Sequence, residues 1–127
     1  MVYHYDYKRP DDLSVVRNLG RKQVTVNFDI KELPEDDSTG YRYSWQSVTL
    51  APGVWSYGAI VSAIVALEYN PNEIEAMTAN LMSALAGILT EGLGKIAEYK
   101  DEFAAFTKWR LHAKEVAKAI IDKYPTP

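Results

Sequence analysis

The chain has 127 residues, of which 47% are hydrophobic and 24% charged, and its formal net charge at pH 7 is −3. This length predicts a single domain with its own core, and this composition excludes disorder along the whole chain. Residues 1–55 and residues 56–127 are both slightly acidic, which disfavours nucleic acid as a partner. The sequence has no cysteine, so disulfides and thiol chemistry are excluded, which is compatible with an intracellular protein.

Neither a signal peptide nor a membrane span is expected. Met1–Pro10 is tyrosine-rich and charged, unlike the apolar region of a signal peptide. The longest weakly polar stretches, Ala59–Leu67 and Leu81–Leu89, are far shorter than the roughly 20 residues that cross a bilayer. We therefore expect a soluble protein that does not use a membrane.

The first 22 residues allow two interpretations. Tyr3, Tyr5 and Tyr7 alternate with polar residues, which is the pattern of a strand with one aromatic face. A proline and two aspartates then break the pattern, and residues 13–19 fit either a short helical turn or a loop. Residues 1–22 form either an edge strand of the chain's own sheet, which we favour, or an arm ordered only by a neighbouring molecule.

The next segment, residues 23–50, predicts a β-hairpin with a long loop. Gln23–Lys31 alternates apolar and polar side chains, as a strand with one buried face does. An acidic loop separates it from a second strand over Tyr41–Leu50. In that strand the aromatic alternation ends at Trp45 and the next large apolar residues change phase, which predicts a β-bulge near Gln46-Ser47. A two-stranded ribbon is marginal alone, so it needs the helices, the N-terminal strand or another subunit.

After a turn at residues 51–53, apolar residues recur every three or four positions, which predicts helices. Ser56 has N-cap chemistry for a first helix that ends near Tyr69. This helix is apolar on nearly every side, as in the centre of a fold or under a subunit interface. Asn72 with Glu75 resembles a capping box that begins a second helix. The predicted core face of the second helix consists of Ile74, Met77, Leu81, Leu85 and Ile88.

Gly87, Gly92 and Gly94 interrupt the helical pattern before a third helix over about Lys95–Lys123. Its apolar residues recur every three or four positions, and this spacing is interrupted only at Arg110. The apolar residues with this spacing are Ile96, Tyr99, Phe103, Phe106, Ala113, Ala117, Ile120 and Tyr124. Acidic residues lie toward the start of this helix and basic residues toward its end, the favourable order for the helix dipole. The whole sequence predicts an α+β fold, with a small antiparallel sheet of two or three strands followed by a three-helix part over residues 56–124.

No catalytic, metal-binding or cofactor-binding constellation is visible. His112 has no second histidine at metal-ligand spacing and is expected at the surface or at the boundary of the core. Gly92-Leu93-Gly94-Lys95 lacks the spacing of phosphate-binding loops. Asp11-Asp12 and Asp36-Asp37 lack the repeated oxygens of calcium loops and are expected as solvated carboxylates. We expect no enzymatic activity, metal or cofactor.

Two sets of side chains are candidates for binding a partner. Arg110, Lys114 and Lys118 form a basic stripe beside Trp109, which is either an anionic-partner site or, as we favour, a solvated helix face. A set of six aromatic residues is either a partner surface or cross-strand packing under the helices. The aromatic set consists of Tyr3, Tyr5, Tyr7, Tyr41, Tyr43 and Trp45.

Motifs typical of helix packing occur in several places, together with an N-terminal segment over Leu13–Asn18. They are Tyr57–Ile64, Glu68–Asn70, Glu73–Ala76, Asn80-Leu81, Phe103–Phe106, Trp109-Arg110 and Ala113–Ala117. In these segments the chain resembles a group of small proteins encoded by phages and prophages of gut bacteria. Relative to that group, Ser83–Lys95 looks like an insertion. The resemblance implies a phage-associated context, such as virion structure or assembly, and it carries no catalytic residue.

The expected function is therefore that of a non-enzymatic structural or assembly protein of the phage or prophage type, acting through protein–protein contacts. Self-association is expected because the first helix is apolar on nearly every side and the sheet is small. The expected location is the host cytoplasm or the virion. The alternative is an adaptor or regulatory module that binds an acidic partner or nucleic acid through the basic face of its last helix.

Overall fold

Four strands precede three helices, and the strands form one antiparallel sheet. The computed structural model describes residues 2–18, 20–50, 55–87 and 93–125. The elements are β1 (His4–Asp6), β2 (Leu13–Asn18), β3 (Arg21–Glu32), β4 (Tyr43–Leu50), α1 (Tyr57–Ala66), α2 (Pro71–Leu85) and α3 (Leu93–Lys123). The strand order is β1-β4-β3-β2, and every neighbouring pair is antiparallel. The predicted α+β class is confirmed, but the predicted two or three strands are wrong because the described residues form a sheet of four.

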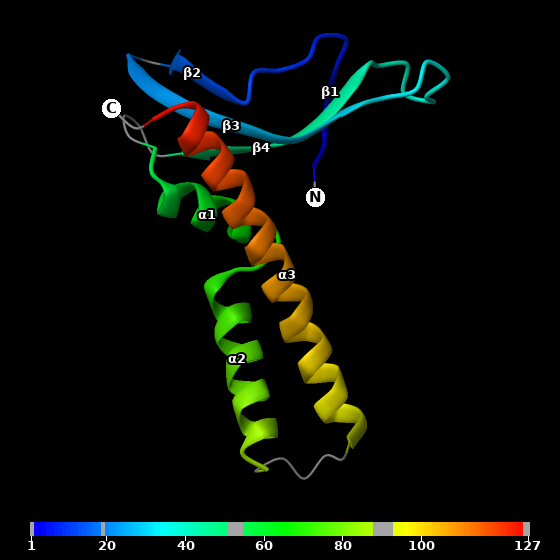
Figure 1. Cartoon of the computed structure of the whole chain (residues 1–127), viewed down its shortest axis with the longest axis vertical. Coiled ribbons are helices and arrows are strands. Elements are labelled where there is room, and N and C mark those ends of the chain that lie inside the picture. Colours follow the sequence, from blue (N-terminus) through cyan, green and yellow to red (C-terminus); the bar gives the residue numbers. More distant parts are fainter. Residues whose placement is uncertain (1, 19, 51–54, 88–92, 126–127) are drawn as a thin grey trace.

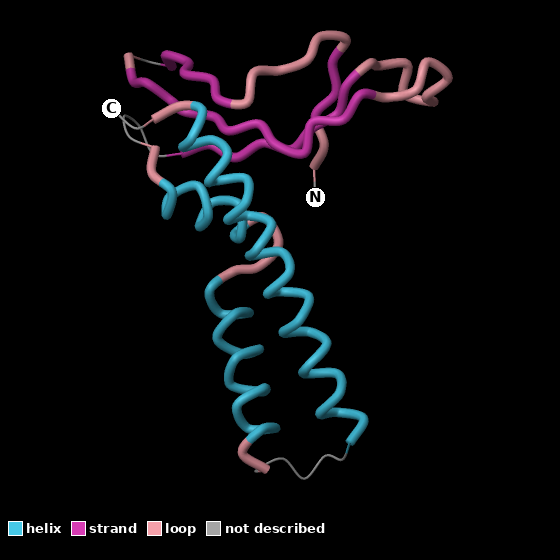
Figure 2. Tube along the Cα trace, viewed as in Figure 1, coloured by secondary structure: helices cyan, strands magenta, loops and turns pink. Residues whose placement is uncertain are grey.

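The helices cover one face of the sheet and then leave it. α1 lies beneath the sheet beside α3, and the second half of α3 reaches the sheet (Figure 1). α2 and the first half of α3 run side by side away from the sheet as a two-helix hairpin (Figure 2). We call α2 with residues 93–105 of α3 the arm. We call the sheet, α1 and residues 106–123 of α3 the platform.

The main core lies in the platform. Its largest fully buried side chains are Val24 and Val26 of β3 and Ile60 and Ile64 of α1. At Arg110, where the apolar spacing of α3 is interrupted, the neighbouring Trp109 packs against the core instead. The Trp109 Nε1–H donates to the carbonyl of Ile64 at 3.1 Å, so α3 is fixed to the end of α1. The platform therefore has both an apolar core and hydrogen bonds between its layers.

The segment that was expected to be a turn or a loop is strand β2. It pairs with β3, with Leu13 opposite Val26 and Asn18 opposite Arg21. Gly20 has a φ of +79°, a conformation that glycine adopts without steric cost. The prediction failed because β2 is short and takes its order from pairing with β3. β1 pairs with β4, so the described parts of residues 1–22 form the two edges of the chain's own sheet, as the edge-strand alternative predicts.

The predicted bulge near Gln46-Ser47 is wrong, because β4 alternates without a break. Ser44 and Gln46 are buried on the same face as Val48 and Leu50. The irregularity lies in the partner strand instead, between Phe28 and Lys31 of β3. Two polar residues occupy inward positions of β4, and a hydrophobicity pattern assigns such residues to the outward face.

The N-cap residues explain where α1 and α2 begin. Ser56 Oγ accepts a hydrogen bond from the Ala59 N–H at 3.1 Å, which confirms the predicted N-cap of α1. The predicted cap of α2 is wrong, because Asn70 is the N-cap and Pro71 follows at the first turn. Asn70 Oδ1 accepts from the Glu73 N–H at 2.8 Å, and the Asn70 side-chain amide donates to Glu73 Oε1 at 2.6 Å. Proline favours the first helical position because its missing N–H would have no partner there.

The turn between α2 and α3 is described only in part. α2 ends at Leu85, and Gly87 follows with a φ of +70°. α3 begins at Leu93, slightly before the predicted start. Ile88 and Gly92, for which a core position and a helix break were predicted, lie outside the described residues.

Candidate functional site

The arm contains only two helices, and this leaves one of its sides open. α2 packs on α3 through a face centred on Met77 and Ala84, both buried. The predicted core face of α2 is wrong at Leu85, which is 68% exposed. Met82 is 64% exposed. A helix in a bundle needs neighbours on more than one side to bury such residues, and the hairpin supplies one neighbour.

One side of α2 carries a continuous apolar stripe. Its members are spaced so that helix geometry places them on one face. The apolar stripe consists of Ile74, Leu81, Met82 and Leu85, with the uncharged Thr78 between them; Met82 and Leu85 are exposed, whereas Ile74, Thr78 and Leu81 are half-buried. The Thr78 hydroxyl donates to the Ile74 carbonyl at 2.8 Å within the helix, so it needs no partner from outside. No member of the apolar stripe is charged.

A hollow of about 400 Å³ lies at the elbow between α1 and α2, next to the apolar stripe. Its lining is mostly apolar and includes Val65, Ala66, Tyr69, Pro71 and Ile74. Ile74 belongs to both features, so the hollow continues the apolar stripe toward the platform. The hollow and the exposed pair Met82 and Leu85 lie at opposite ends of α2.

The other side of the arm is polar. A hollow of about 320 Å³ there is lined by Glu73, Asn80 and Glu102 together with Met77 and Ala76. Two carboxylates therefore lie on this side, whereas Glu75 is the charged residue that borders the elbow hollow on the opposite side. The two sides of the arm differ in charge, and the apolar stripe marks the nearly neutral one.

In the platform, a polar cluster of Asp29, Gln46 and His112 joins the sheet to α3. His112 Nε2 lies 2.8 and 3.0 Å from the two Asp29 carboxylate oxygens. The Gln46 side-chain amide donates to Asp29 Oδ2 at 3.4 Å. Since an ionised carboxylate only accepts hydrogen bonds, Nε2 carries the proton in this contact. The bulge in β3 turns Asp29 toward α3, and this residue has a φ of +52°, which is uncommon for a residue other than glycine.

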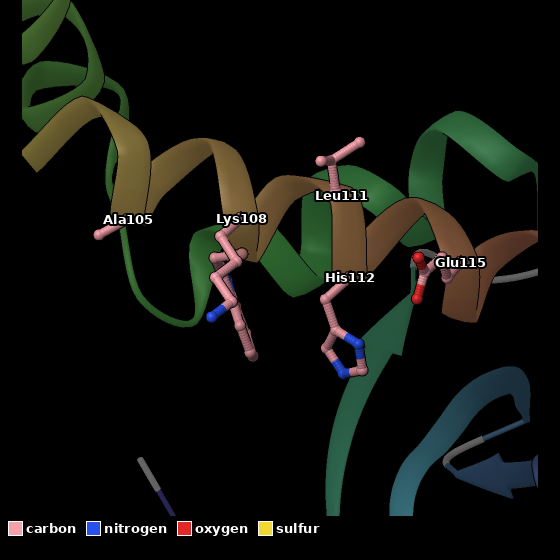
Figure 3. A pocket seen from close by; sticks show the side chains of 6 residues that line it. Ala105, Lys108, Leu111, His112 and Glu115 are labelled. Carbon is pink, nitrogen blue, oxygen red and sulfur yellow. The ribbon is translucent and has the colours of Figure 1, made fainter. Parts of the chain in front are cut away.

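The polar cluster borders an open groove of about 580 Å³ along α3. Figure 3 shows Lys108 and His112 on the same side of α3, with Leu111 on the other side. The His112 ring lies 5.7 Å from Trp109 and 6.5 Å from Phe28, centroid to centroid. An Asp–His pair can orient an imidazole for proton transfer, but catalysis also needs a reacting group positioned beside it. Among the described residues that line the groove, no serine, threonine, cysteine or tyrosine is present.

No pattern in the sequence predicted the polar cluster. Asp29 and His112 are 83 positions apart, and no local pattern relates them. The one available signal was the pair of polar residues in β4 that broke the hydrophobic alternation. Among the described residues, no three histidine, cysteine, aspartate or glutamate side chains lie together as a metal site would require.

The aspartate pairs make contacts within the chain. Asp12 accepts from Lys123 Nζ at 2.7 Å and lies 3.5 Å from an Arg9 guanidinium nitrogen. The Asp12 hydrogen bond raises the pKa of Lys123 above its ordinary value of 10.5. Asp37 accepts from the Thr39 hydroxyl and backbone N–H, which lowers the pKa of Asp37 below its ordinary value of 3.8. The Asp37 contacts are local, whereas the Asp12 contact joins the segment before β2 to the end of α3.

The aromatic set is divided between the two faces of the sheet. Trp45 stacks on His4, its partner across the β1–β4 pair, with ring centroids 6.0 Å apart. Tyr5 stands opposite Ser44, so it lies on the other face. Tyr5 stacks on Tyr41 with ring centroids 6.0 Å apart, and the Tyr7 ring meets Tyr41 at a tilt of 49° with centroids 5.1 Å apart.

Four members of the aromatic set are exposed, and two are half-buried. The exposed ones are Tyr3, Tyr5, Tyr7 and Tyr41. Tyr43 and Trp45 are half-buried. Because each of the four tyrosines is at least 39% exposed, packing under the helices does not account for them. The partner surface therefore stays a prediction for this subset.

The basic stripe lies on α3, but Trp109 is not part of the same surface because it faces α1. Arg110 and Lys118 are exposed and Lys114 is half-buried. Trp109 points toward α1, where its N–H meets the Ile64 carbonyl, and so it is a structural residue. Within the part of the chain that the structure describes, no hydrogen bond or ion pair joins the basic stripe to an acidic residue. Its use by a partner stays a prediction.

Comparisons with protein-family models, with curated proteins and with solved structures gave no match. Across residues 2–18, 20–50, 55–87 and 93–125, no helix is both long enough and apolar enough to cross a membrane. Function is therefore inferred from the arm, the polar cluster and the charged surfaces of the chain itself.

Proposed function

We propose that this chain is a structural or assembly component of the phage or prophage type, which acts by contact with other protein chains, including copies of itself. The observation that carries the proposal is the arm, a two-helix hairpin that extends from the sheet with Met82 and Leu85 more than 60% exposed. A contiguous group of exposed apolar side chains on a helix is typical of a surface that contacts another molecule. The resemblance in the helix-packing segments supplies the phage context, with the host cytoplasm or the virion as the location.

The polar cluster fits this proposal as a structural tie. Asp29 and Gln46 belong to the sheet, and His112 belongs to α3, so their contacts hold the two layers of the platform in one orientation. Gln46 is only 4% exposed; its amide N–H donates to the Asp29 carboxylate, while its Oε1 is buried without a hydrogen-bond partner among the described residues. A rigid platform fixes the direction in which the arm extends, which an assembly component requires.

Light scattering across a range of protein concentrations tests the proposal. We expect a defined oligomer whose mass is a small multiple of 14.3 kDa. The genes on either side of the coding sequence give a second test, and we expect tail or capsid genes among them. A chain that stays monomeric at every concentration, encoded away from any phage gene, would contradict the proposal.

A second candidate is an adaptor that binds an acidic partner through the basic stripe. It is favoured by one observation, the three basic side chains on one face of α3 for which the described residues provide no acidic partner. Reversing the charges of Arg110, Lys114 and Lys118 should then abolish binding to an acidic protein, and binding by the natural sequence should weaken as salt is added. Binding that neither salt nor charge reversal changes would exclude this candidate.

A further inference from the structure

We propose that the apolar stripe of α2 is covered by the apolar stripe of a second copy of the chain, so that two arms form an antiparallel four-helix bundle. This inference rests on the proposed function and names its first partner. It is carried by the exposure of Met82 and Leu85, the hollow at the elbow and the difference in charge between the two sides of the arm.

The arm alone presents a contact side of modest size, which the elbow enlarges. α2 has 15 residues and is therefore about 22 Å long. Two helices packed about 8–10 Å apart present a side roughly 20 Å wide. The outline of this side is about 440 Å², about half of the roughly 800 Å² per partner that specific interfaces bury, and the lining of the elbow hollow adds to it.

The charges on the two sides of the arm indicate which side contacts the same side of a second copy. An isologous contact places the same surface of the two copies face to face, so the like charges of that surface come close to one another and repel. The side with Glu73 and Glu102 would bring four carboxylates together in a pair of copies. The apolar stripe has no charge of its own, and only Glu75 borders it at the elbow. The nearly neutral side is therefore the one that can face itself with less repulsion.

The positions of the exposed residues and the hollow select the antiparallel arrangement. Met82 and Leu85 lie near the far end of α2, and the elbow hollow lies at its start. A two-fold axis across the arm, close to Thr78, places the Met82 and Leu85 of each copy against the elbow hollow of the other. Parallel copies would bring the two exposed ends against each other but would leave both hollows facing each other and unfilled. The antiparallel pair fills both hollows with apolar side chains.

The absence of cysteine from the sequence makes disulfide trapping a direct test. Thr78→Cys lies beside the proposed axis, so it should give a disulfide-linked dimer under mild oxidation. A mixture of Ile74→Cys and Met82→Cys chains should give the mixed dimer in excess over either self-linked dimer. Ala76→Cys, which lines the polar side at nearly the same height on α2, is the matched control and should stay unlinked. Equal linking of Thr78→Cys and Ala76→Cys would overturn the arrangement.

Charge insertion gives an independent readout by light scattering. Met82→Glu with Leu85→Glu should weaken association by at least about 100-fold, because carboxylates would enter the apolar interface. Ala76→Glu adds charge to the polar side and should leave association unchanged. Both variants change exposed positions, and circular dichroism should show the helix content of the natural sequence in each. If the natural chain forms an oligomer that neither variant disrupts, this inference is wrong and the proposed function stands; if the natural chain is monomeric, self-assembly itself is wrong.

Discussion

The platform is closed by contacts between distant parts of the sequence, whereas the arm is a hairpin of two helices that follow one another in the chain. In the platform, His112 contacts Asp29 across 83 positions, and Trp109 donates to Ile64 across 45. In the arm, the Thr78 hydroxyl reaches back only four positions along α2. Local bonds define a helix but do not fix what packs against it.

This difference explains why the platform has a closed core and the arm has an open side. A sheet covered by α1 and the second half of α3 buries side chains from three directions, and Ile60 and Ile64 are fully buried there. Two helices bury one face each, so Leu85 stays 68% exposed. The platform is therefore expected to provide the stability of the monomer, and the arm to provide the association.

The strongest test of this comparison removes one large apolar side chain from each region. Ile64→Ala should lower the free energy of unfolding by about 2–5 kcal/mol, because it leaves a cavity in a fully buried site. Leu85→Ala should change it by about 0.5 kcal/mol or less in dilute solution, where the chain is monomeric. Urea unfolding followed by circular dichroism measures both. Similar losses for the two variants would show that the arm belongs to the monomer core.

A second test concerns the residue that ties the sheet to α3. Asp29→Ala should lower the free energy of unfolding by about 1–3 kcal/mol, because His112 and Gln46 lose their acceptor and alanine tolerates a φ of +52° poorly. Asp29→Asn should lose less, since asparagine adopts this conformation readily and keeps one acceptor oxygen.

Asp29→Gly separates the two causes of that loss. Glycine relieves the backbone but provides no acceptor, so a loss close to that of the alanine variant would assign the effect to the hydrogen bonds. A glycine variant as stable as the natural chain would show that the polar cluster adds nothing to stability.

The same comparison shows what the sequence could predict. The α+β class and the N-cap of α1 followed from local patterns, because alternation and capping act within a few residues. β2 was missed because it takes its order from β3. The bulge was assigned to the wrong strand because Ser44 and Gln46 face inward with hydrogen-bonding or packing partners that only the fold provides.

Local sequence patterns also could not reveal the open side of the arm or the polar cluster. The open side of the arm was hidden by the prediction that Ile74, Met77, Leu81 and Leu85 share one core face. Helical spacing does place these residues near one another, but it cannot tell how many helices are available to cover them. The polar cluster was invisible for the opposite reason, since its residues come from three separate elements.

A third test, with a smaller effect, concerns the elbow where the arm leaves the platform. Asn70→Ala should lower stability by about 1 kcal/mol, because the Glu73 N–H loses its acceptor at 2.8 Å. Hydrogen exchange should become faster in the first turn of α2 while β3 keeps its protection. Asn72→Ala, at the position where the sequence predicted the cap, is the control and should have no such effect. A larger effect at position 72 than at position 70 would contradict the observed cap.

The smallest expected effect concerns the end of α3 at the edge of the platform. The hydrogen bond from Lys123 Nζ to Asp12 raises the pKa of Lys123 above 10.5, so Asp12→Asn should lower that pKa toward 10.5. A pKa that is higher in the folded chain means that the contact stabilises the fold at lower pH and is lost as the pH rises through the folded value. The contribution is therefore complete at neutral pH and disappears only in alkaline solution. Titration of Lys123 by nuclear magnetic resonance measures the pKa, with Asp11→Asn as the control, because no contact joins the Asp11 carboxylate to Lys123 among those the structure describes. An unchanged Lys123 pKa in Asp12→Asn would show that this contact is not maintained in solution, and the end of α3 would then be held by its apolar contacts and by the hydrogen bond that the Trp55 Nε1–H donates to the Tyr124 carbonyl at 2.8 Å.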